Sequence, residues 1–172
     1  MSQIRRIKLP ALYNLRDLGG YAGAEGKSTC WNKLYRCDCP AELTADQWEV
    51  MKGLGIKTLV DIRSTYEANE LPVKAPDYMT YIQRPFFYEE PGADLTGEAG
   101  KKFLESLSID YCVMTESSLK SVAAILNAIL ENITKGSVAF FCTAGKDRTG
   151  IIAAEILRLC GVCDDERVHT VL

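Results

Sequence analysis

Histidine is almost absent from this chain of 172 residues, since it occurs only once, at His169. A single imidazole excludes zinc sites that need two or three histidines, and it argues against a Ser-His-Asp triad. Long apolar runs are missing too. No stretch approaches the roughly 18 residues of a transmembrane helix, and the charged N-terminus contains no signal-peptide core. We therefore expect no integral membrane segment.

Neither positive charge nor cysteine is abundant. Lys and Arg number 20 against 23 Asp and Glu, and the resulting net charge of −3 does not suggest binding to nucleic acid through bulk charge. Seven cysteines are an odd number and too few for a disulfide scaffold. The sequence therefore predicts reduced thiols and a cytoplasmic location.

Four cysteines match a structural zinc site in number, in the pairs Cys37/Cys39 and Cys160/Cys163. Cys160, however, ends an apolar helix pattern and is better explained as a small core residue. We therefore expect no metal site.

The composition itself is that of an ordinary globular protein, with 47% hydrophobic and 25% charged residues. The length suits one domain over residues 1–172. Strand-like runs alternate with helical stripes. Strands are expected at 33–36, 57–63, 78–87 and 137–141, and helices at 45–53, 119–133, 151–160 and from 164 onward. This alternation predicts an α/β fold with a central, mostly parallel sheet flanked by helices.

Two further segments carry weaker predictions. Residues 89–100 are acidic, contain glycine and have few large apolar side chains, so we expect a mobile surface loop. Arg16, Asp17, Asp61 and Arg63 are expected to form an ion-pair network that supports the site described next.

The segment 141–150 lies between a buried strand and a helix expected from about Thr149. In an open α/β sheet, ligands bind at the carboxyl ends of the strands. Five residues separate Cys142 from Arg148, and a loop of that length can turn its backbone N–H groups inward. Gly145 can adopt the conformation that such a turn needs. The segment 142–148, hereafter the signature loop, is therefore predicted to bind an anion at the positive end of the helix.

The side chains of the signature loop suit phosphoryl transfer. A helix N-terminus and nearby cations favour the thiolate of Cys142. Arg148 offers two parallel N–H donors that match two oxygens of a phosphoryl group, and Thr149 is expected to donate its hydroxyl to the sulfur. The backbone from Thr143 through Ala144, Gly145 and Lys146 to Arg148 would bind the substrate. These features predict hydrolysis of phosphate monoesters through a cysteinyl-phosphate intermediate, with no cofactor.

The string Cys-Thr-Ala-Gly-Lys-Asp-Arg-Thr-Gly at 142–150 resembles the signature of the protein tyrosine phosphatase superfamily. It is closer still to the bacterial and fungal tyrosine phosphatase-like family, which includes secreted lipid and tyrosine phosphatases. Residues 14–20, 34–36 and 59–64, with Glu67, resemble other boxes of that family, so the likeness covers about residues 9–168. The resemblance implies a tyrosine-phosphatase-like fold with more helix after Asp165 than this chain contains, as a truncated chain would show. It also leaves secretion open.

The same resemblance implies that Asp147 is the general acid for the leaving group. Asp147 would also suit a surface role in which it balances its cationic neighbours. Glu89, Glu90 or Asp94 could instead supply the proton from the neighbouring loop. The sequence leaves these alternatives open.

The expected partner is a phosphorylated protein or a phosphoinositide. Phosphotyrosine is the first choice, with phosphoserine or phosphothreonine (dual specificity) as alternatives, and Lys146 adds charge that would help to hold a second phosphate. One residue departs from the family pattern, because Phe141 stands where a histidine usually precedes the nucleophile. That departure favours, as the alternative, a pseudophosphatase that binds phosphorylated ligands without turnover. A sulfur-transfer enzyme with a persulfide on Cys142 is a further alternative, but it would not need Arg148.

Overall fold

The computed structural model describes residues 4–87, 89, 92–107, 114, 116 and 118–171, with side chains as far as Arg167. Within these residues the chain forms a sheet of five strands in the order β1-β2-β5-β3-β4. The strands are β1 (Arg16–Asp17), β2 (Leu34–Cys37), β3 (Ile56–Asp61), β4 (Thr80–Gln83) and β5 (Ser137–Phe141). Only the β1–β2 pair is antiparallel. The prediction of a mostly parallel sheet is therefore confirmed.

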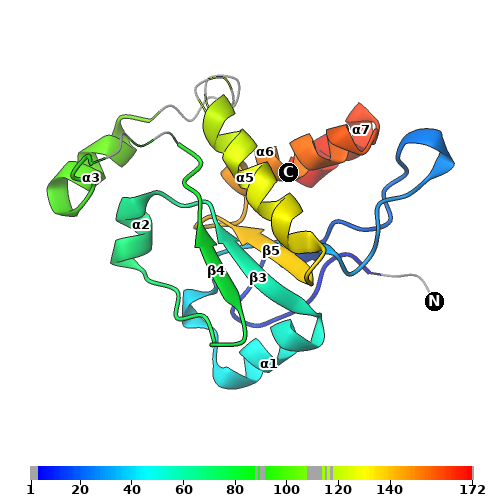
Figure 1. Cartoon of the computed structure of the whole chain (residues 1–172), viewed down its shortest axis with the longest axis horizontal. Helices are drawn as coiled ribbons and strands as arrows, with labels where there is room; N and C mark the ends of the chain where they lie inside the picture. Colours follow the sequence, from blue (N-terminus) through cyan, green and yellow to red (C-terminus); the bar gives the residue numbers. More distant parts are fainter. Residues whose placement is uncertain are drawn as a thin grey trace.

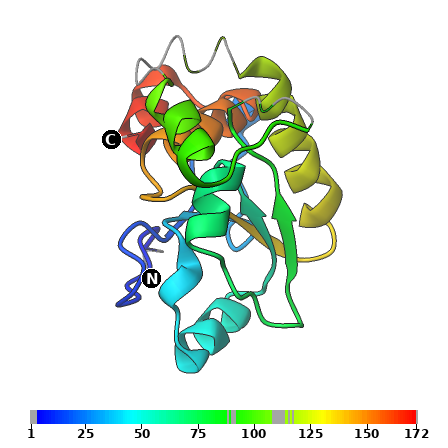
Figure 2. The ribbon, with the colours of Figure 1, turned by 90° about the vertical axis from the view of Figure 1, so that its left-hand side faces the viewer.

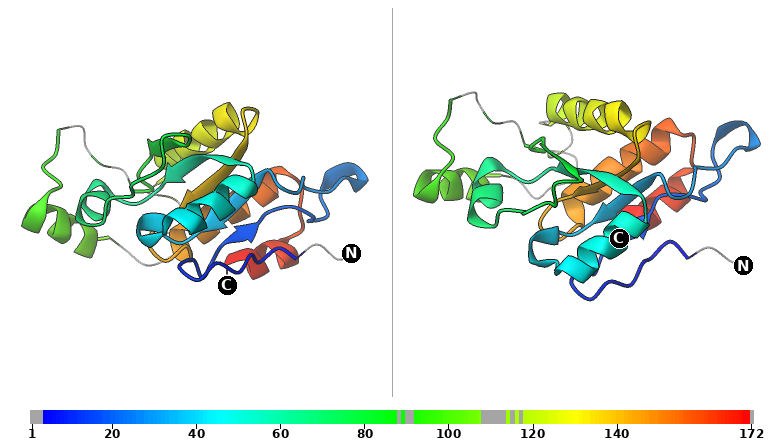
Figure 3. Two further views of the ribbon diagram at one scale, coloured as in Figure 1. Left: turned by 90° about the horizontal axis from the view of Figure 1, so that it is seen from below. Right: turned by 60° about the horizontal axis from the view of Figure 1, so that its bottom comes forward.

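Helices cover both faces of this sheet (Figures 1 and 3). The described helices are α1 (Ala45–Gly53), α2 (Thr65–Glu70), α3 (Gly97–Glu105), α5 (Leu119–Ile133), α6 (Asp147–Leu159) and α7 (Asp164–Val171), with short 3-10 turns at Ala24–Gly26 and Pro40–Glu42. Apolar side chains of α5 and α6 share one core with the sheet, and Trp48 and Met51 of α1 belong to a second core on the other face. The predictions for residues 45–53 and 119–133 are confirmed.

Strand β5 is the centre of the molecule, and all of its residues are buried. Because side chains alternate along a strand, Val138 and Phe140 pack toward α5 and α6, while Ala139 and Phe141 pack toward α1. On either side, β2 and β3 run parallel to β5. The carboxyl ends of three neighbouring strands therefore meet at the point where the signature loop begins.

Two predicted strand and loop boundaries are wrong. The strand expected at 78–87 covers only Thr80–Gln83, although the backbone N–H groups of Arg84 and Phe86 still donate to the carbonyl oxygens of Asp61 and Ile62. The segment 89–100, expected to be a loop, includes the start of helix α3 at Gly97. The apolar side chain that marks this helix, Phe103, lies beyond that window and packs against the core shared with α5.

The start of helix α6 was also placed too late. The helix begins at Asp147 rather than near Thr149, so Asp147, Arg148 and Thr149 all lie in its first turn. The first turn of a helix has backbone N–H groups without partners inside the helix. The shift therefore brings the side chain of Arg148 and the positive end of the helix to the same place.

Candidate active site

Cys142 lies at the junction of β5 and the signature loop, and only 2% of its surface is exposed. Its backbone N–H donates to Thr149 Oγ1 over 3.0 Å. This bond ties the first residue of the loop to the first turn of α6. The Thr149 hydroxyl oxygen thus contacts the backbone of Cys142, and its expected donation to the sulfur stays a prediction.

The carbonyl groups of the signature loop are held from outside the loop. The bonds are Cys39 N to Thr143 O (3.1 Å), Asn14 Nδ2 to Ala144 O (2.8 Å), and Arg36 Nη2 to Gly145 O (2.6 Å) and to Lys146 O (3.1 Å). In a trans peptide the C=O and the following N–H point in opposite directions, and no described peptide is cis. The N–H groups of residues 144–147 therefore face away from these donors, into the hollow of the loop. This is the arrangement that binds an anion.

Gly145 is the tightest point of the loop. Its φ is +63°, and a Cβ there would lie 2.4 Å from the carbonyl oxygen of Cys37 and 2.5 Å from the backbone nitrogen of Asp38. The signature loop therefore packs directly on the end of β2, which only glycine permits at this position.

We expect Gly145→Ala to lower the free energy of unfolding by about 1–3 kcal/mol and to reduce turnover, because the loop must move away from β2. Thermal unfolding and phosphate release measure the two effects. Gly26→Ala is the matched control, since Gly26 has a similar φ of +70° but no neighbouring atom within 4 Å of its Cβ position. Equal losses in the two variants would show that contact with β2 is unimportant.

Arg36 supports the signature loop, a role that the sequence did not predict. It was recognised only as part of a family-like box, yet it holds two carbonyl groups of the signature loop from the middle of β2 and is 2% exposed. Burial and repulsion from Arg16 lower the pKa of Arg36 to about 10, so the side chain stays charged at neutral pH. Its charge attracts a thiolate at Cys142. The available signal was an arginine in an otherwise apolar strand.

The N-terminal segment (dark blue in Figure 2) lies beside the signature loop (orange), and Asn14 of this segment binds Ala144 of the loop. Asp38, just after β2, accepts hydrogen bonds from the backbone N–H groups of Tyr13 and Asn14, each at 3.0 Å. These bonds fix the backbone of the segment. The side chain of Asn14 is thereby positioned to hold Ala144.

Arg148 is held by Glu67 from helix α2. Nη1 and Nη2 of Arg148 donate to the two carboxylate oxygens of Glu67 over 2.6 and 2.7 Å, and both side chains are 13% exposed. The Thr143 hydroxyl donates to the same carboxylate over 2.5 Å. A guanidinium has five N–H donors. The end-on pair with Glu67 does not use the Nε–H group, while Nη2 also donates to Thr143 Oγ1 over 3.3 Å. A phosphoryl group at the Nε edge would therefore share Nη2 with Thr143 or displace it.

Glu67 is ionised because of this contact. Burial opposes its charged form, but hydrogen bonds and charge attraction from Arg148 outweigh burial and lower the pKa of Glu67 from 4.5 to about 2. The same pair, together with a nearby Cys142 thiolate, raises the pKa of Arg148 although burial opposes its charge. A carboxylate with a lowered pKa stabilises the fold above its unfolded pKa, and that contribution disappears as the pH falls through the folded pKa.

We therefore expect Glu67→Gln to cost about 2–3 kcal/mol of unfolding free energy at pH 7, because Arg148 loses the partner of its largely buried charge. The difference from the unchanged protein should shrink between pH 4.5 and about 2. Urea unfolding across that range measures it. Glu49→Gln, at an exposed pair with Lys52, is the control and should change little. A Glu67→Gln deficit that stays constant at low pH would contradict the assignment.

The expected network of Arg16, Asp17, Asp61 and Arg63 divides into three parts. Arg63 and Asp61 form a fully buried ion pair at 2.6 Å. Asp17 instead accepts from the backbone N–H groups of Gly19 and Asn32, and Arg16 donates to the side chain of Asn14. Arg16 connects to the signature loop through the amide of Asn14, and Arg63 connects to it through Glu67, whose carbonyl oxygen accepts from Arg63 Nη1 over 3.4 Å.

The buried pair fixes helix α2. Arg63 Nη1 donates to the carbonyl oxygen of Leu71 at the end of α2 over 2.9 Å, and the Tyr81 hydroxyl donates to Asp61 over 2.6 Å. Phe141, which stands where the resemblance would place a histidine, has its ring 5.5 Å from the Arg63 guanidinium. The phenylalanine therefore belongs to the support of α2 on the α1 face of the sheet, whereas Cys142 faces α5 and α6.

The candidate general acids differ in their surroundings. Asp147 lies within the signature loop, in the first turn of α6. Glu89 accepts from the backbone N–H and hydroxyl of Thr65 over 2.8 and 2.6 Å, and Asp94 makes the same two contacts with Thr96. Glu89 is therefore bound to the first residue of α2, and Asp94 to a residue two positions further along its own segment. Glu90 lies outside the described residues.

The sequence predicted no membrane-spanning segment, and the lengths of the described helices can be compared with that prediction. None of them is both long and apolar enough to cross a bilayer. The side chain of His169 lies outside the described part of the chain.

Comparison with protein families gives a match over almost the whole chain. A model described as the tyrosine phosphatase family matches residues 7–169. The chain is 31% identical over 170 residues to a protein of Cupriavidus necator, and 34% identical over 128 residues to one of Nostoc commune, both named as tyrosine-protein phosphatases. These matches cover 93% and 74% of this chain, but 59% and 43% of the relatives. The chain thus spans about half the length of the curated relatives it matches.

Solved structures show the same fold at low sequence identity. P. aeruginosa TpbA is 16% identical with a TM-score of 0.54, over 96% of this chain and 76% of that one. The kinase associated phosphatase KAP is 12% identical with a TM-score of 0.52, over 91% and 82%. A cysteine-to-serine variant of TpbA has been crystallised in complex with phosphotyrosine. The expected tyrosine-phosphatase-like α/β fold is confirmed.

Proposed function

Because this chain belongs to the tyrosine phosphatase family, we propose that it hydrolyses phosphate monoesters through a phosphorylated Cys142, with phosphotyrosine as the first substrate. The observation that carries the proposal is the outward anchoring of the loop carbonyls by Arg36, Asn14 and Cys39. It pre-organises the N–H groups of 144–147 around the point where Cys142 begins the loop. Donors fixed in advance stabilise charge that develops during a reaction.

In the first step the Cys142 thiolate attacks phosphorus. The S–P bond forms while the bond from phosphorus to the leaving oxygen breaks, and Asp147 donates its proton to that oxygen. The loop N–H groups and the Nε edge of Arg148 hold the phosphoryl oxygens, while Glu67 holds the other edge of the guanidinium. The products of this step are a free alcohol or phenol and the phosphorylated cysteine.

In the second step water attacks the same phosphorus atom. The O–P bond forms, the S–P bond breaks, and the electron pair returns to sulfur as the Cys142 thiolate. Asp147, now a carboxylate, accepts a proton from the water and is ready for another turnover. Thr149, whose hydroxyl oxygen accepts from the backbone N–H of Cys142, would stabilise the returning thiolate by turning its O–H toward the sulfur.

Phosphate release from matched substrates tests the function. A phosphotyrosine peptide, a phosphoserine peptide and a soluble phosphoinositide are compared at equal concentrations, and we expect phosphotyrosine to be hydrolysed fastest. TpbA, which shares the fold, has been crystallised with phosphotyrosine, and this supports the order. No release from any substrate by a protein that still binds tungstate would contradict hydrolysis and support the pseudophosphatase alternative, which Phe141 favours.

Asp147→Asn tests the general acid. We expect kcat for a phosphotyrosine peptide to fall by about 10²-fold, because the leaving phenolate receives no proton. The fall should be much smaller for p-nitrophenyl phosphate, whose leaving group needs less help. Glu89→Gln and Asp94→Asn are the matched controls. A loss in either control that depends on the leaving group, with Asp147→Asn unaffected, would move the acid to the 89–94 segment.

A further inference from the structure

A cavity of about 710 Å³ lies at the edge of the sheet opposite the signature loop. Its lining includes Leu34, the first residue of β2, and Ile133 and Thr134, which come just before β5. Because β2 and β5 are parallel, these residues mark the amino ends of the strands, whereas Cys142 follows the carboxyl end of β5. The cavity is therefore separate from the site proposed for phosphate.

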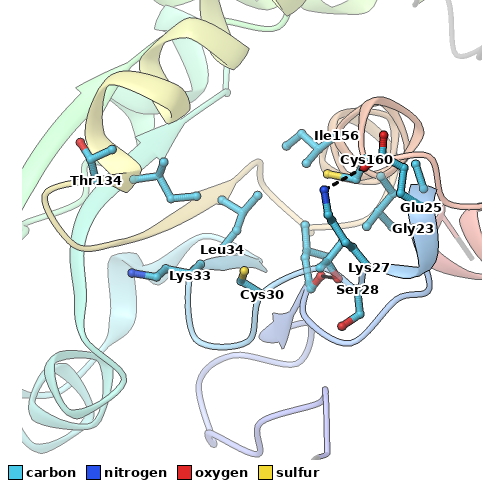
Figure 4. Close-up of a pocket in the computed structure, with 15 residues that line it drawn as sticks. Gly23, Glu25, Lys27, Ser28, Cys30, Lys33, Leu34, Thr134, Ile156 and Cys160 are labelled. Carbon is cyan, nitrogen blue, oxygen red and sulfur yellow. Dashed lines mark hydrogen bonds and ion pairs between the residues drawn. The ribbon is translucent and has the colours of Figure 1, made fainter.

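The walls of this cavity are mainly aliphatic (Figure 4). They come from five parts of the fold: the residue that follows β1, the segment 23–30, the start of β2, the end of α5 and the end of α6. The aliphatic lining residues are Leu18, Ala24, Leu34, Ile133, Ile156 and Leu157. Pockets of about 300–1,000 Å³ with such walls and a few polar groups are typical of small-molecule sites.

The two lysines that line the cavity, Lys27 and Lys33, differ in whether an acidic side chain balances their charge. Lys27 forms an ion pair with Glu25 over 2.8 Å, so its charge is already balanced. No acidic side chain in the described part of the chain pairs with Lys33. In Figure 4 the Lys33 ammonium and Thr134 lie on the side of the cavity away from Cys160. One end of the cavity therefore offers a positive charge and a hydroxyl, and the rest offers hydrocarbon.

We propose that this cavity binds a medium-chain carboxylic acid, with its carboxylate at Lys33 and its hydrocarbon chain against the aliphatic walls. The charge of Lys33 selects an anion. The aliphatic walls reward each methylene that leaves water. An elongated amphipathic acid satisfies both conditions at once, which neither a wholly apolar nor a highly charged ligand does.

Cysteines at the cavity allow a direct test with decanoate below its micelle concentration. Cys30 and Cys160 line the cavity and are exposed, while Cys163 is exposed but lies outside the lining. Iodoacetamide alkylation of each thiol is followed by peptide mass spectrometry. We expect saturating decanoate to slow alkylation of Cys30 and Cys160 several-fold and to leave Cys163 unchanged. Unchanged rates at all three cysteines, or equal slowing at all three, would overturn the proposal.

Calorimetric titration tests whether the hydrocarbon chain binds the aliphatic walls of the cavity and whether the carboxylate binds Lys33. Affinity should rise about fourfold with each methylene from hexanoate to decanoate. Lys33→Ala should weaken decanoate binding about threefold to fivefold, whereas Lys27→Ala should leave it unchanged. The methyl ester of decanoic acid should bind the unchanged protein as weakly as decanoate binds Lys33→Ala. Equal effects of the two lysine variants on decanoate binding would overturn the proposal. Slower alkylation of Cys30 and Cys160 at raised protein concentration, without decanoate, would also overturn it and would indicate that a second copy of the chain covers the cavity.

Discussion

Cys142→Ser is expected to lower turnover by about 10⁴-fold or more, because a serine hydroxyl is not ionised at neutral pH and cannot replace the thiolate as nucleophile. Binding of a phosphate mimic should survive. The N–H groups that face the hollow are held by Arg36, Asn14 and Cys39 from outside the signature loop, and none of these contacts involves the sulfur.

Steady-state phosphate release and calorimetric titration with tungstate measure the two properties of this variant. Cys163→Ser, at an exposed cysteine away from the loop, is the control and should keep full activity. Hydrolysis by Cys142→Ser above a few per cent of the starting rate would rule out the covalent mechanism. Loss of tungstate binding would show that the loop depends on the sulfur for its shape.

Arg148→Lys is expected to lower kcat by about 10²–10³-fold, the cost of removing one preorganised donor from an oxyanion site. Lysine keeps the positive charge but loses the planar fork. In this protein the fork is proposed to have two tasks, since one edge binds Glu67 and the edge formed by Nε and Nη2, which also contacts Thr143, would bind the phosphoryl group. A lysine ammonium cannot perform both with the same geometry.

The control for this variant is Arg158→Lys, which lies on the same helix in an exposed pair with Glu155. It should leave kcat unchanged. A change of less than threefold for Arg148→Lys would mean that Arg148 does not face the phosphoryl group. In that case the contact with Glu67 would be purely structural, and the pH-dependent stability expected for Glu67 would remain while the catalytic effect disappeared.

The sequence predicted those parts of the fold that depend on local pattern. The apolar run of β5 and the apolar stripe of α5 each act within a short window, and both elements lie where they were expected. Helix α3 was missed because its polar first turn resembles a loop, and the apolar Phe103 that identifies it comes only near its end.

The candidate site was predicted in part for a related reason. Cys142, Arg148 and Thr149 are neighbours in the sequence, so one motif revealed them together. Glu67 and Arg36 reach the signature loop only because β5 lies between β2 and β3, and the order of strands cannot be derived from one sequence. The partners of Arg148 and of the loop carbonyls therefore required the three-dimensional structure.

The most direct test of the account is to trap the phosphorylated enzyme. The unchanged protein is mixed with a phosphotyrosine peptide, quenched within a single turnover, digested and examined by mass spectrometry. The account predicts one phosphoryl group on the peptide that contains Cys142, which appears with a burst of dephosphorylated product and decays as inorganic phosphate is released. Steady hydrolysis of the peptide with no phosphoryl group on Cys142 at any time would contradict it.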